Sequence, residues 1–285
     1  MTLLIVLFIA TLGACMNYSD NLARDIALPL SAALYSSNEA HFLHKKLNVS
    51  SSVTVLTVEM NGSSCSGLIT TLPQSPSVAM AFSADLSVLT IFGGLEKLFY
   101  PLENWRHKGN VSPFLKQAFE SLWKGVMENF FRQIVEEPKN QEVLITGHSF
   151  GGGLAALIAY DIVREGLINK DNVTLITLGQ SLVGDKNFSK ALEEQVKDSF
   201  RVVCKDNCIP HMPSQACGYE NIGREESKTP VHLSGFLRGM NSEGFKICGD
   251  LKGDGCSGTQ TNPIRVDMND KYFVKNVTEF GMKCK

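Results

Sequence analysis

The chain has 285 residues, of which 44% are hydrophobic, 20% charged and 8% aromatic, as in an ordinary globular protein. This composition excludes a disordered tail protein, a collagen and a coiled-coil rod. The chain carries 27 lysines and arginines against 29 aspartates and glutamates, so its formal net charge is -2. Because no basic stripe is present, we do not expect it to bind nucleic acid.

The N-terminus has the pattern of a secretory signal peptide. Residues 3–12 are almost wholly apolar, and the small Gly13 and Ala14 follow, as at a signal-peptidase site. This run is too short to span a bilayer, and no later stretch is apolar enough to be a transmembrane segment. We therefore expect residues 1–16 to be removed, in preference to forming a buried helix, and residues 17–285 to form one secreted, soluble domain.

Sequons and cysteines also favour an extracellular location. Asn-x-Ser/Thr sequons, which are surface positions when glycosylated, begin at Asn17, Asn48, Asn61, Asn110, Asn172, Asn187 and Asn276. The chain has eight cysteines, and loss of Cys15 leaves an odd number, so at least one is free or bonded to a partner chain. A zinc site at Cys204, Cys208 and Cys217 is less favoured than disulfides because no Cys-x-x-Cys pair occurs. We expect no metal and no cofactor.

Strand and helix signals alternate along the chain. Apolar runs between turn residues predict strands over 53–58, 68–72, 78–82, 143–146, 173–178 and 200–204. Ser112 and Pro113 predict a helix start, because a hydroxyl caps a helix and proline fits its first position. Apolar residues at helical spacing continue this helix to Phe130, and further helices are predicted over 154–163 and 187–197.

This alternation predicts an α/β fold with a mostly parallel central sheet and helices on both faces. From about residue 208 the chain is rich in glycine, asparagine and cysteine. We therefore expect a loop-rich, cross-linked C-terminal part, without a clear domain boundary before it.

The sharpest motif is Gly147-His148-Ser149-Phe150-Gly151, which lies between a buried strand and an Ala/Leu-rich helix. This is the context of a nucleophile elbow, in which flanking glycines permit a strained turn and close packing of the helix. The elbow places the Ser149 hydroxyl at the helix N-terminus, where the backbone N–H of Phe150 can stabilise an oxyanion. The alternative is a glycine-rich turn that only closes a strand–helix unit.

With these motifs the chain resembles the class 3, or fungal-type, lipases in their secreted, cysteine-containing form. The resemblance runs from residue 29 nearly to the C-terminus, through the elbow and the segments 29–35, 65–67, 109–113, 177–184, 200–203, 209–213 and 272–273. It implies an α/β-hydrolase fold and the hydrolysis of acylglycerols or other lipid esters by a Ser-Asp-His triad, in that chain order.

Three of the four catalytic positions that the resemblance implies carry other residues. Ser149 occupies the nucleophile position, but the acid position is Asn207, with Asp206 one residue earlier. The base position, three residues before a Tyr-Phe pair, is Asn269. The oxyanion-hole donor position after the third strand is Asp85. An amide cannot take the proton from serine, and an inward carboxylate would repel an oxyanion.

Other residues offer few substitutes for the missing groups. Asp206 can reach the acid position by a one-residue shift of its loop, and His232, which we place in a loop, follows the acid in the correct order. His148 points away from its neighbour in an elbow, and His211 belongs to the family pattern as a structural residue. The favoured hypothesis is a weak or inactive pseudoenzyme that binds a lipid or a partner, and the alternative is an active lipase with a rearranged triad.

The resemblance also implies a lid and a disulfide. The apolar stretch from Leu86 to Tyr100 corresponds to the lid over the acyl groove and would contact a lipid interface, although a buried core helix is an equally good interpretation. Cys248 and Cys256 match a cysteine pair of the family and are the first choice for a disulfide. Cys65 and Cys284 have lost their usual family partners.

Overall fold

The computed structural model describes residues 18–50, 52–60, 63–74, 76–85, 100–135, 141–204, 209–213, 215–222, 229–233, 246–248, 271–273 and 275–283. The side chains of residues 204, 229–233 and 246–248 are excepted. The expected signal peptide, residues 1–16, and most of the expected lid therefore lie outside the described part. None of the helices in the described ranges is both long and apolar enough to cross a membrane.

An eight-stranded sheet forms the centre of the fold, in the order β1-β2-β3-β6-β7-β8-β9-β10. Its strands are β1 (Thr54–Met60), β2 (Ser63–Thr71), β3 (Val78–Asp85), β6 (Val143–His148), β7 (Val173–Leu178), β8 (Asp198–Cys204), β9 (Thr229–Leu233) and β10 (Lys246–Cys248). The five strands from β3 to β9 are mutually parallel, whereas β1, β2 and β10 add antiparallel edges. The carboxyl ends of the parallel strands therefore meet at one edge.

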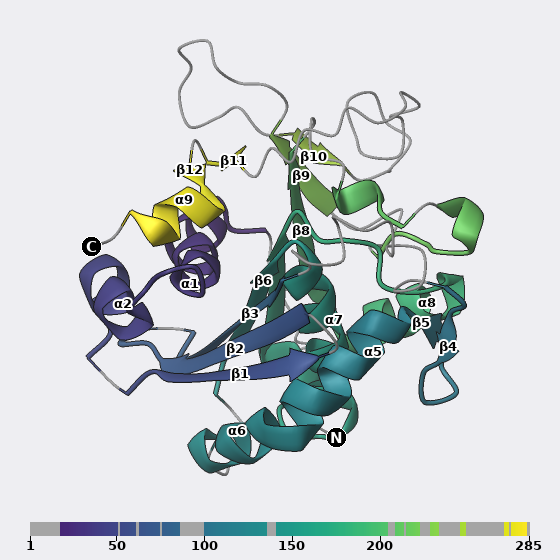
Figure 1. Cartoon of the computed structure of the whole chain (residues 1–285), viewed down its shortest axis with the longest axis horizontal. Helices are drawn as coiled ribbons and strands as arrows, with labels where there is room; N and C mark the ends of the chain where they lie inside the picture. Colours follow the sequence, from purple (N-terminus) through teal and green to yellow (C-terminus); the bar gives the residue numbers. More distant parts are fainter. Residues whose placement is uncertain are drawn as a thin grey trace, which may run out of the picture.

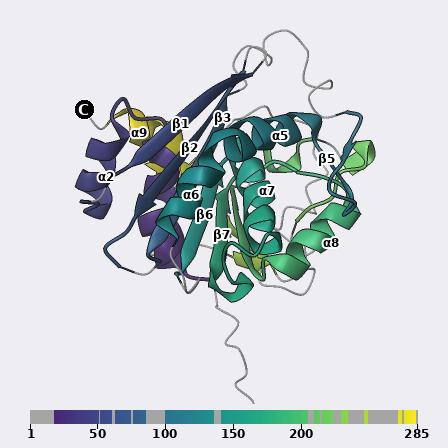
Figure 2. The ribbon, with the colours of Figure 1, turned by 90° about the horizontal axis from the view of Figure 1, so that it is seen from below.

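Helices cover both faces of this sheet (Figures 1 and 2). One face carries α5 (Pro113–Ala118), η2 (Phe119–Met127), α6 (Glu128–Ile134), α7 (Phe150–Arg164) and α8 (Lys186–Gln195). The other carries η1 (Leu22–Ala27), α1 (Leu28–Ala33), α2 (Glu39–Leu47) and α9 (Val277–Met282). Three short 3-10 helices are described, η3 (Lys170–Asn172), η4 (Ile209–His211) and η5 (Gln215–Cys217). Two small two-stranded sheets pair β4 (Glu103–Asn104) with β5 (Asn110–Val111) and β11 (Lys271–Tyr272) with β12 (Lys275–Asn276).

Alternation along the strands divides the buried side chains into two cores. In β3, Met80 and Phe82 face the α7 side, whereas Ala79 and Ala81 face the α1 side. The strand β6 is buried along its whole length because helices cover both of its faces. The predicted α/β fold, with its mostly parallel sheet and helices on both faces, is confirmed.

The predicted strands and helices over 53–204 are present, with bounds that shift by a few residues. The Ser112 cap is confirmed, since its hydroxyl oxygen accepts a hydrogen bond from the Leu115 N–H at 3.4 Å. Among the described residues after 208, β9 and β10 extend the main sheet and α9 packs on α1, and the sequence had predicted none of these elements. His232 accordingly lies in the strand β9 and not in a loop.

Candidate functional site

Ser149 lies at a sharp turn between β6 and α7, as an elbow requires. Its backbone has φ 59° and ψ -126°, a conformation that costs a non-glycine residue on the order of 1–3 kcal/mol. Close packing on both sides holds this turn in place. A Cβ on Gly147 would lie 2.3 Å from the Gly151 carbonyl oxygen, and a Cβ on Gly151 would lie 2.2 Å from the Phe82 carbonyl oxygen. The predicted strand–turn–helix is confirmed.

Backbone hydrogen bonds fix Ser149 in the sheet. Its N–H donates to the Leu178 carbonyl at 2.9 Å, and its carbonyl accepts from the Gly152 N–H at 3.1 Å and the Ser181 N–H at 3.4 Å. Its half-buried side chain makes no hydrogen bond with another described residue and does not cap α7. The hydroxyl thus lies beside the positive end of a 15-residue helix that begins at Phe150, the geometry that favours a developing negative charge.

His148 belongs to the opposite face of the sheet from α7. Its Nδ1 is 2.9 Å from the Tyr35 hydroxyl, and its ring packs edge-on against Tyr35 and Tyr272, with centroids 5.8 Å and 5.9 Å away. The imidazole is 6% exposed. His148 therefore contacts Tyr35 and Tyr272 on the α1 side of the sheet, and these contacts hold the residue that precedes the nucleophile.

The acid and base positions, Asn207 and Asn269, lie outside the described residues, as does Asp206. The flanking elements are described: β8 ends at Cys204, at the same sheet edge as the elbow. Tyr272 follows Asn269 by three residues and is fully buried against His148. Tyr272 thus packs beside the elbow, and the position of Asn269 as the base stays a prediction.

The backbone of His232 lies between β8 and β10, paired with Val203 and Lys246. Its side chain is not among the described ones, so its role as a substitute base stays a prediction.

Asp85 lies at the carboxyl end of β3, on the edge that carries Ser149. Phe82, three residues earlier, pairs with Gly147, two residues before the nucleophile. Asp85 itself pairs with Ser64 of β2 and is exposed. Asp85 therefore lies at the strand end beside the elbow and is exposed, and its place at the oxyanion-donor position stays a prediction.

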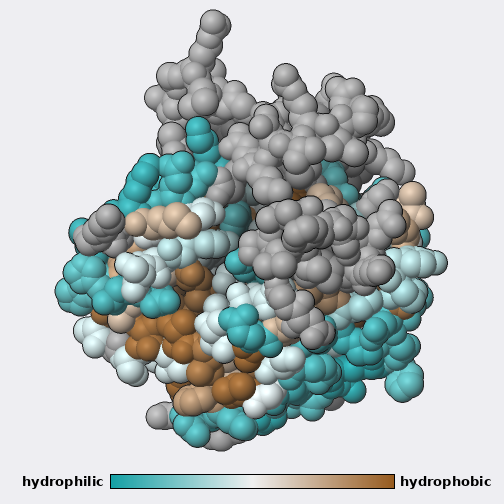
Figure 3. Space-filling view, in the orientation of Figure 1, coloured by the Kyte–Doolittle hydropathy of each residue, from teal (hydrophilic) through white to brown (hydrophobic). Residues whose placement is uncertain are grey.

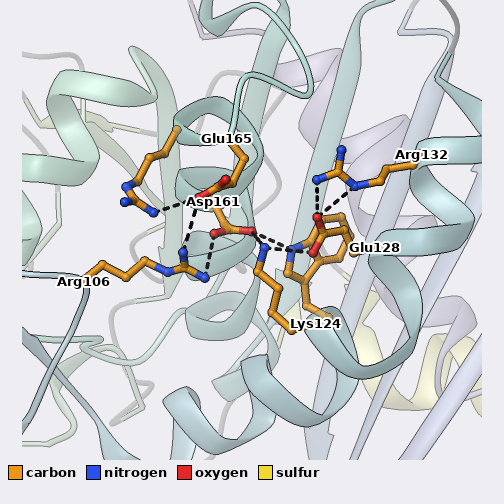
Figure 4. A network of polar contacts seen from close by, with 8 residues as sticks. Arg106, Lys124, Glu128, Arg132, Asp161 and Glu165 are labelled. Atoms are coloured by element: carbon orange, nitrogen blue, oxygen red, sulfur yellow. Dashed lines mark hydrogen bonds and ion pairs between the residues drawn. The ribbon is translucent and has the colours of Figure 1, made fainter.

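A buried carboxylate, which the sequence did not reveal, anchors α7 to the elements around it (Figure 4). Asp161 is fully buried and lies 2.7 Å from Lys124 Nζ and 3.1 Å from Arg106 Nη2, while Trp123 Nε1 donates to it at 2.9 Å. Burial alone would lower the pKa of Lys124, but its hydrogen bonds to Asp161 and Glu128 outweigh burial and raise it. This network joins η2 and the β4–β5 hairpin to the helix that begins at the nucleophile.

A second buried charge, Arg201, lies within β8. The Arg201 side chain is 2% exposed, and its Nη1 donates to Asn221 Oδ1 at 2.8 Å and to the Ile222 carbonyl at 3.3 Å. Burial lowers the pKa of Arg201 to about 10. Burial, with the Arg201 charge, also lowers the pKa of His211, which favours a neutral, structural imidazole.

The cysteines with described side chains include two free thiols, the buried Cys65 and the exposed Cys217. Burial, with a smaller effect of Glu59, raises the pKa of the Cys65 thiol to about 12. Cys248 lies in β10, but Cys256 lies outside the described residues, so their disulfide stays a prediction. In the described part, no group of three potential metal ligands occurs.

Comparisons with known proteins agree with this geometry. The family model described as Lipase (class 3) matches residues 79–217, a range that includes the elbow. A lipase of Caenorhabditis elegans is 29% identical over 93% of this chain and 82% of its own length. The Rhizomucor miehei lipase is 31% identical over 53% of this chain and only 38% of its own length.

The crystal structure of a mono- and diacylglycerol lipase from Aspergillus oryzae superimposes with a TM-score of 0.73. It covers 93% of this chain and 100% of the fungal one at 13% sequence identity, a likeness in fold. The family model, the C. elegans relative and the elbow together support a relationship of this chain to the class 3 lipases, and the solved structures share its fold.

Proposed function

We propose that this chain is a secreted lipase-like protein of lipid metabolism whose ester-hydrolysis site is impaired, so that it acts mainly by binding a lipid or a partner. The observation that carries the proposal is the position of Tyr272 against His148. This contact supports the alignment of the C-terminal Tyr-Phe pair with the family pattern, and that alignment assigns Asn269 to the base.

An asparagine at the base position removes the chemistry that activates serine. A hydroxyl is a poor nucleophile unless a base takes its proton, and a neutral amide has no site for that proton. In serine proteases, changing only the acid to an amide already lowers the rate about 10⁴-fold. With Asn207 at the acid position as well, the elbow positions the Ser149 hydroxyl, but no base removes its proton.

The oxyanion position adds a third loss. Removing one oxyanion donor costs about 10² to 10³ in rate. An ionised Asp85 side chain supplies no hydrogen-bond donor for an oxyanion, and the residue is exposed. The backbone N–H at the α7 terminus remains as the source of stabilisation.

Lipid is the proposed ligand class, by analogy with the relatives' names. The A. oryzae protein of similar fold is a mono- and diacylglycerol lipase, and the C. elegans relative is a lipase. Of the expected lid segment, the described Tyr100 is 63% exposed, which suits a contact with a lipid interface.

The alternative is an active lipase in which Asp206 and His232 complete a rearranged triad. The strained backbone of Ser149 favours it, since such strain is typical of a working nucleophile. In that case His232→Gln should abolish turnover as completely as Ser149→Ala.

A reactivity assay on the secreted protein decides between the two functions. A fluorophosphonate probe requires an activated serine, so it should barely label the wild type, and p-nitrophenyl butyrate turnover should equal that of Ser149→Ala. Restoring Asn207→Asp and Asn269→His, with Arg-Gly-Thr at positions 83–85, should produce labelling at Ser149. Rapid labelling of the wild type would refute impairment.

A further inference from the structure

A groove lies far from the elbow, between η1, α2 and the connection from β2 to β3. Its cavity volume is about 580 Å³. Leu22, Ile26, Leu47 and Leu72 form its apolar floor, and the first three are only half-buried. Figure 3 shows a hydrophobic surface patch between α2 and the start of β1. The groove therefore exposes apolar side chains to which the lipase site gives no role.

Asn48 stands at the rim of this groove and begins the sequon Asn48-Val49-Ser50. It ends α2 in a left-handed conformation with φ 52°, which asparagine tolerates better than most residues. Its backbone N–H donates to the His44 carbonyl at 3.1 Å, while its exposed side-chain amide makes no hydrogen bond with another described residue. Ser50 is exposed too. Nδ2 of Asn48, the atom to which a sugar would be attached, is thus exposed and has no hydrogen bond within the described part of the chain.

Asn110 begins a sequon with the opposite environment. Its Nδ2 donates to Asp185 Oδ2 at 2.7 Å and its backbone N–H donates to the same oxygen at 3.0 Å. The hydroxyl of Ser112, the third sequon residue, is fully buried and caps α5. A sugar on Asn110 would occupy the space of this contact, so only chains unmodified there should reach the native fold.

We propose that Asn48 carries an N-linked glycan whose first sugars cover the groove. In the transfer, Nδ2 of Asn48 forms a bond to the anomeric carbon of a polyprenyl-diphosphate-linked oligosaccharide. The bond from that carbon to the diphosphate oxygen breaks, the polyprenyl diphosphate leaves with the electron pair, and the amide loses one proton to a base.

A sugar ring fits the groove chemically. Its C–H face suits the leucine and isoleucine floor, and its hydroxyls can bond to Asp25 and Gln74, which also line the groove. The occupant is attached at the rim, so it reaches the floor without the entropy cost of binding from solution. The inference is independent of the lipase site and depends only on passage through the secretory pathway.

Expression with a heterologous signal peptide in eukaryotic cells tests the proposal without relying on residues 1–16. Glycopeptide mass spectrometry should find Asn48 occupied and Asn110 unoccupied. Asn187, exposed in the first turn of α8, begins a sequon remote from the groove whose serine, Ser189, is buried, and it serves as the control position.

Ser50→Ala removes the Asn48 sequon and keeps the left-handed asparagine, and Asn187→Gln is the matched control. Trypsin should cleave Ser50→Ala after the exposed Lys45 and Lys46 at least about threefold faster than the wild type, because the groove sugars shield this end of α2. Asn187→Gln should be cleaved like the wild type. If Ser50→Ala is not secreted, enzymatic removal of glycans from the folded wild type gives the same comparison.

Two results would overturn the proposal. One is a secreted chain with Asn48 unmodified or Asn110 occupied. The other is an Asn48 glycan whose removal leaves the cleavage rate unchanged, which would mean that the sugars extend into solvent.

Discussion

Replacing Asp161 by asparagine removes one buried charge while keeping the shape of the side chain. Lys124 and Arg106 then lose the carboxylate that both contact, at 2.7 Å and 3.1 Å. Trp123 Nε1 can still donate to the new amide oxygen, so the indole keeps its hydrogen bond. The change therefore isolates the electrostatic part of the network from its packing.

The magnitude follows from burial. Removing one partner of a fully buried charge pair costs about 3–5 kcal/mol when the remaining charge stays buried without a partner. The Lys124 and Arg106 side chains are 24% and 25% exposed and keep Glu128 and Glu165 as partners, so the lower end applies. We expect Asp161→Asn to lose about 3 kcal/mol of unfolding free energy, or a melting temperature lower by roughly 6–10 °C.

Urea unfolding, followed by tryptophan fluorescence, measures this loss. Glu165→Gln is the matched control, because its exposed contact with Arg106 at 3.4 Å should contribute less than about 1 kcal/mol. If Asp161→Asn stayed within about 0.5 kcal/mol of the wild type, the network would not stabilise α7, and the structural reasoning would fail.

Three further predictions concern packing, thiols and pH. Gly151→Ala should destabilise the fold by more than about 4 kcal/mol in the same unfolding assay, because its Cβ would lie 2.2 Å from the Phe82 carbonyl oxygen of β3. Gly125→Ala in η2 is the control and should be neutral or stabilising, because its Cβ would lie 3.4 Å from the nearest atom. A thiol reagent at pH 8 should label Cys217 promptly and Cys65 only after unfolding, because burial raises the pKa of Cys65 to about 12; equal labelling in the folded protein would contradict this. Burial would raise the pKa of Glu128, but hydrogen bonds from Lys124 and Arg132 outweigh burial and lower that pKa. The ionised Glu128 side chain therefore stabilises the fold above its unfolded-state pKa, and this stabilisation is lost as the pH falls through its folded-state pKa. Glu128→Gln should therefore be less stable than the wild type at pH 7 and equal to it in acid, and a pH-independent difference would oppose this assignment.

Local sequence patterns predicted the central sheet because its strands are short segments rich in apolar and β-branched residues between turn residues. β6 and β7 are buried throughout, and their neighbouring helices carry one apolar face. The N-terminal helices were not predicted, although Asn38 caps α2 by accepting from the His41 N–H at 2.9 Å. The moderate hydrophobicity of α2 gives a weak periodic signal, and its stability comes from packing on α1 and α9.

The C-terminal strands escaped prediction for a different reason. β9 is five residues long and contains Pro230, which argues against a strand when only neighbours in sequence are considered. It exists because it pairs with the end of β8, and that contact is non-local. His232 was misplaced for this reason.

The nucleophile could be predicted because the elbow is a contiguous motif, whereas its supports could not. Tyr35 and Tyr272 come from opposite ends of the chain and meet at His148 only after the sheet has formed. In the sequence, Asp161 is one polar residue of a helix, and only the folded structure brings Lys124 and Arg106 into contact with it. The sequence gives residue types, and only the topology brings these side chains together.

Retention of the strained Ser149 backbone has a structural explanation that does not need catalysis. Gly151 packs against the Phe82 carbonyl and Gly147 against Gly151, so relaxing the turn would require moving α7 away from β3. That movement would expose part of the main core, which costs far more than the roughly 1–3 kcal/mol of backbone strain. A chain without a catalytic base would therefore still keep this elbow, because the fold depends on the same close contacts. Serine reactivity, and not the geometry of the turn, is consequently the property that would distinguish an active enzyme from an inactive protein with this fold.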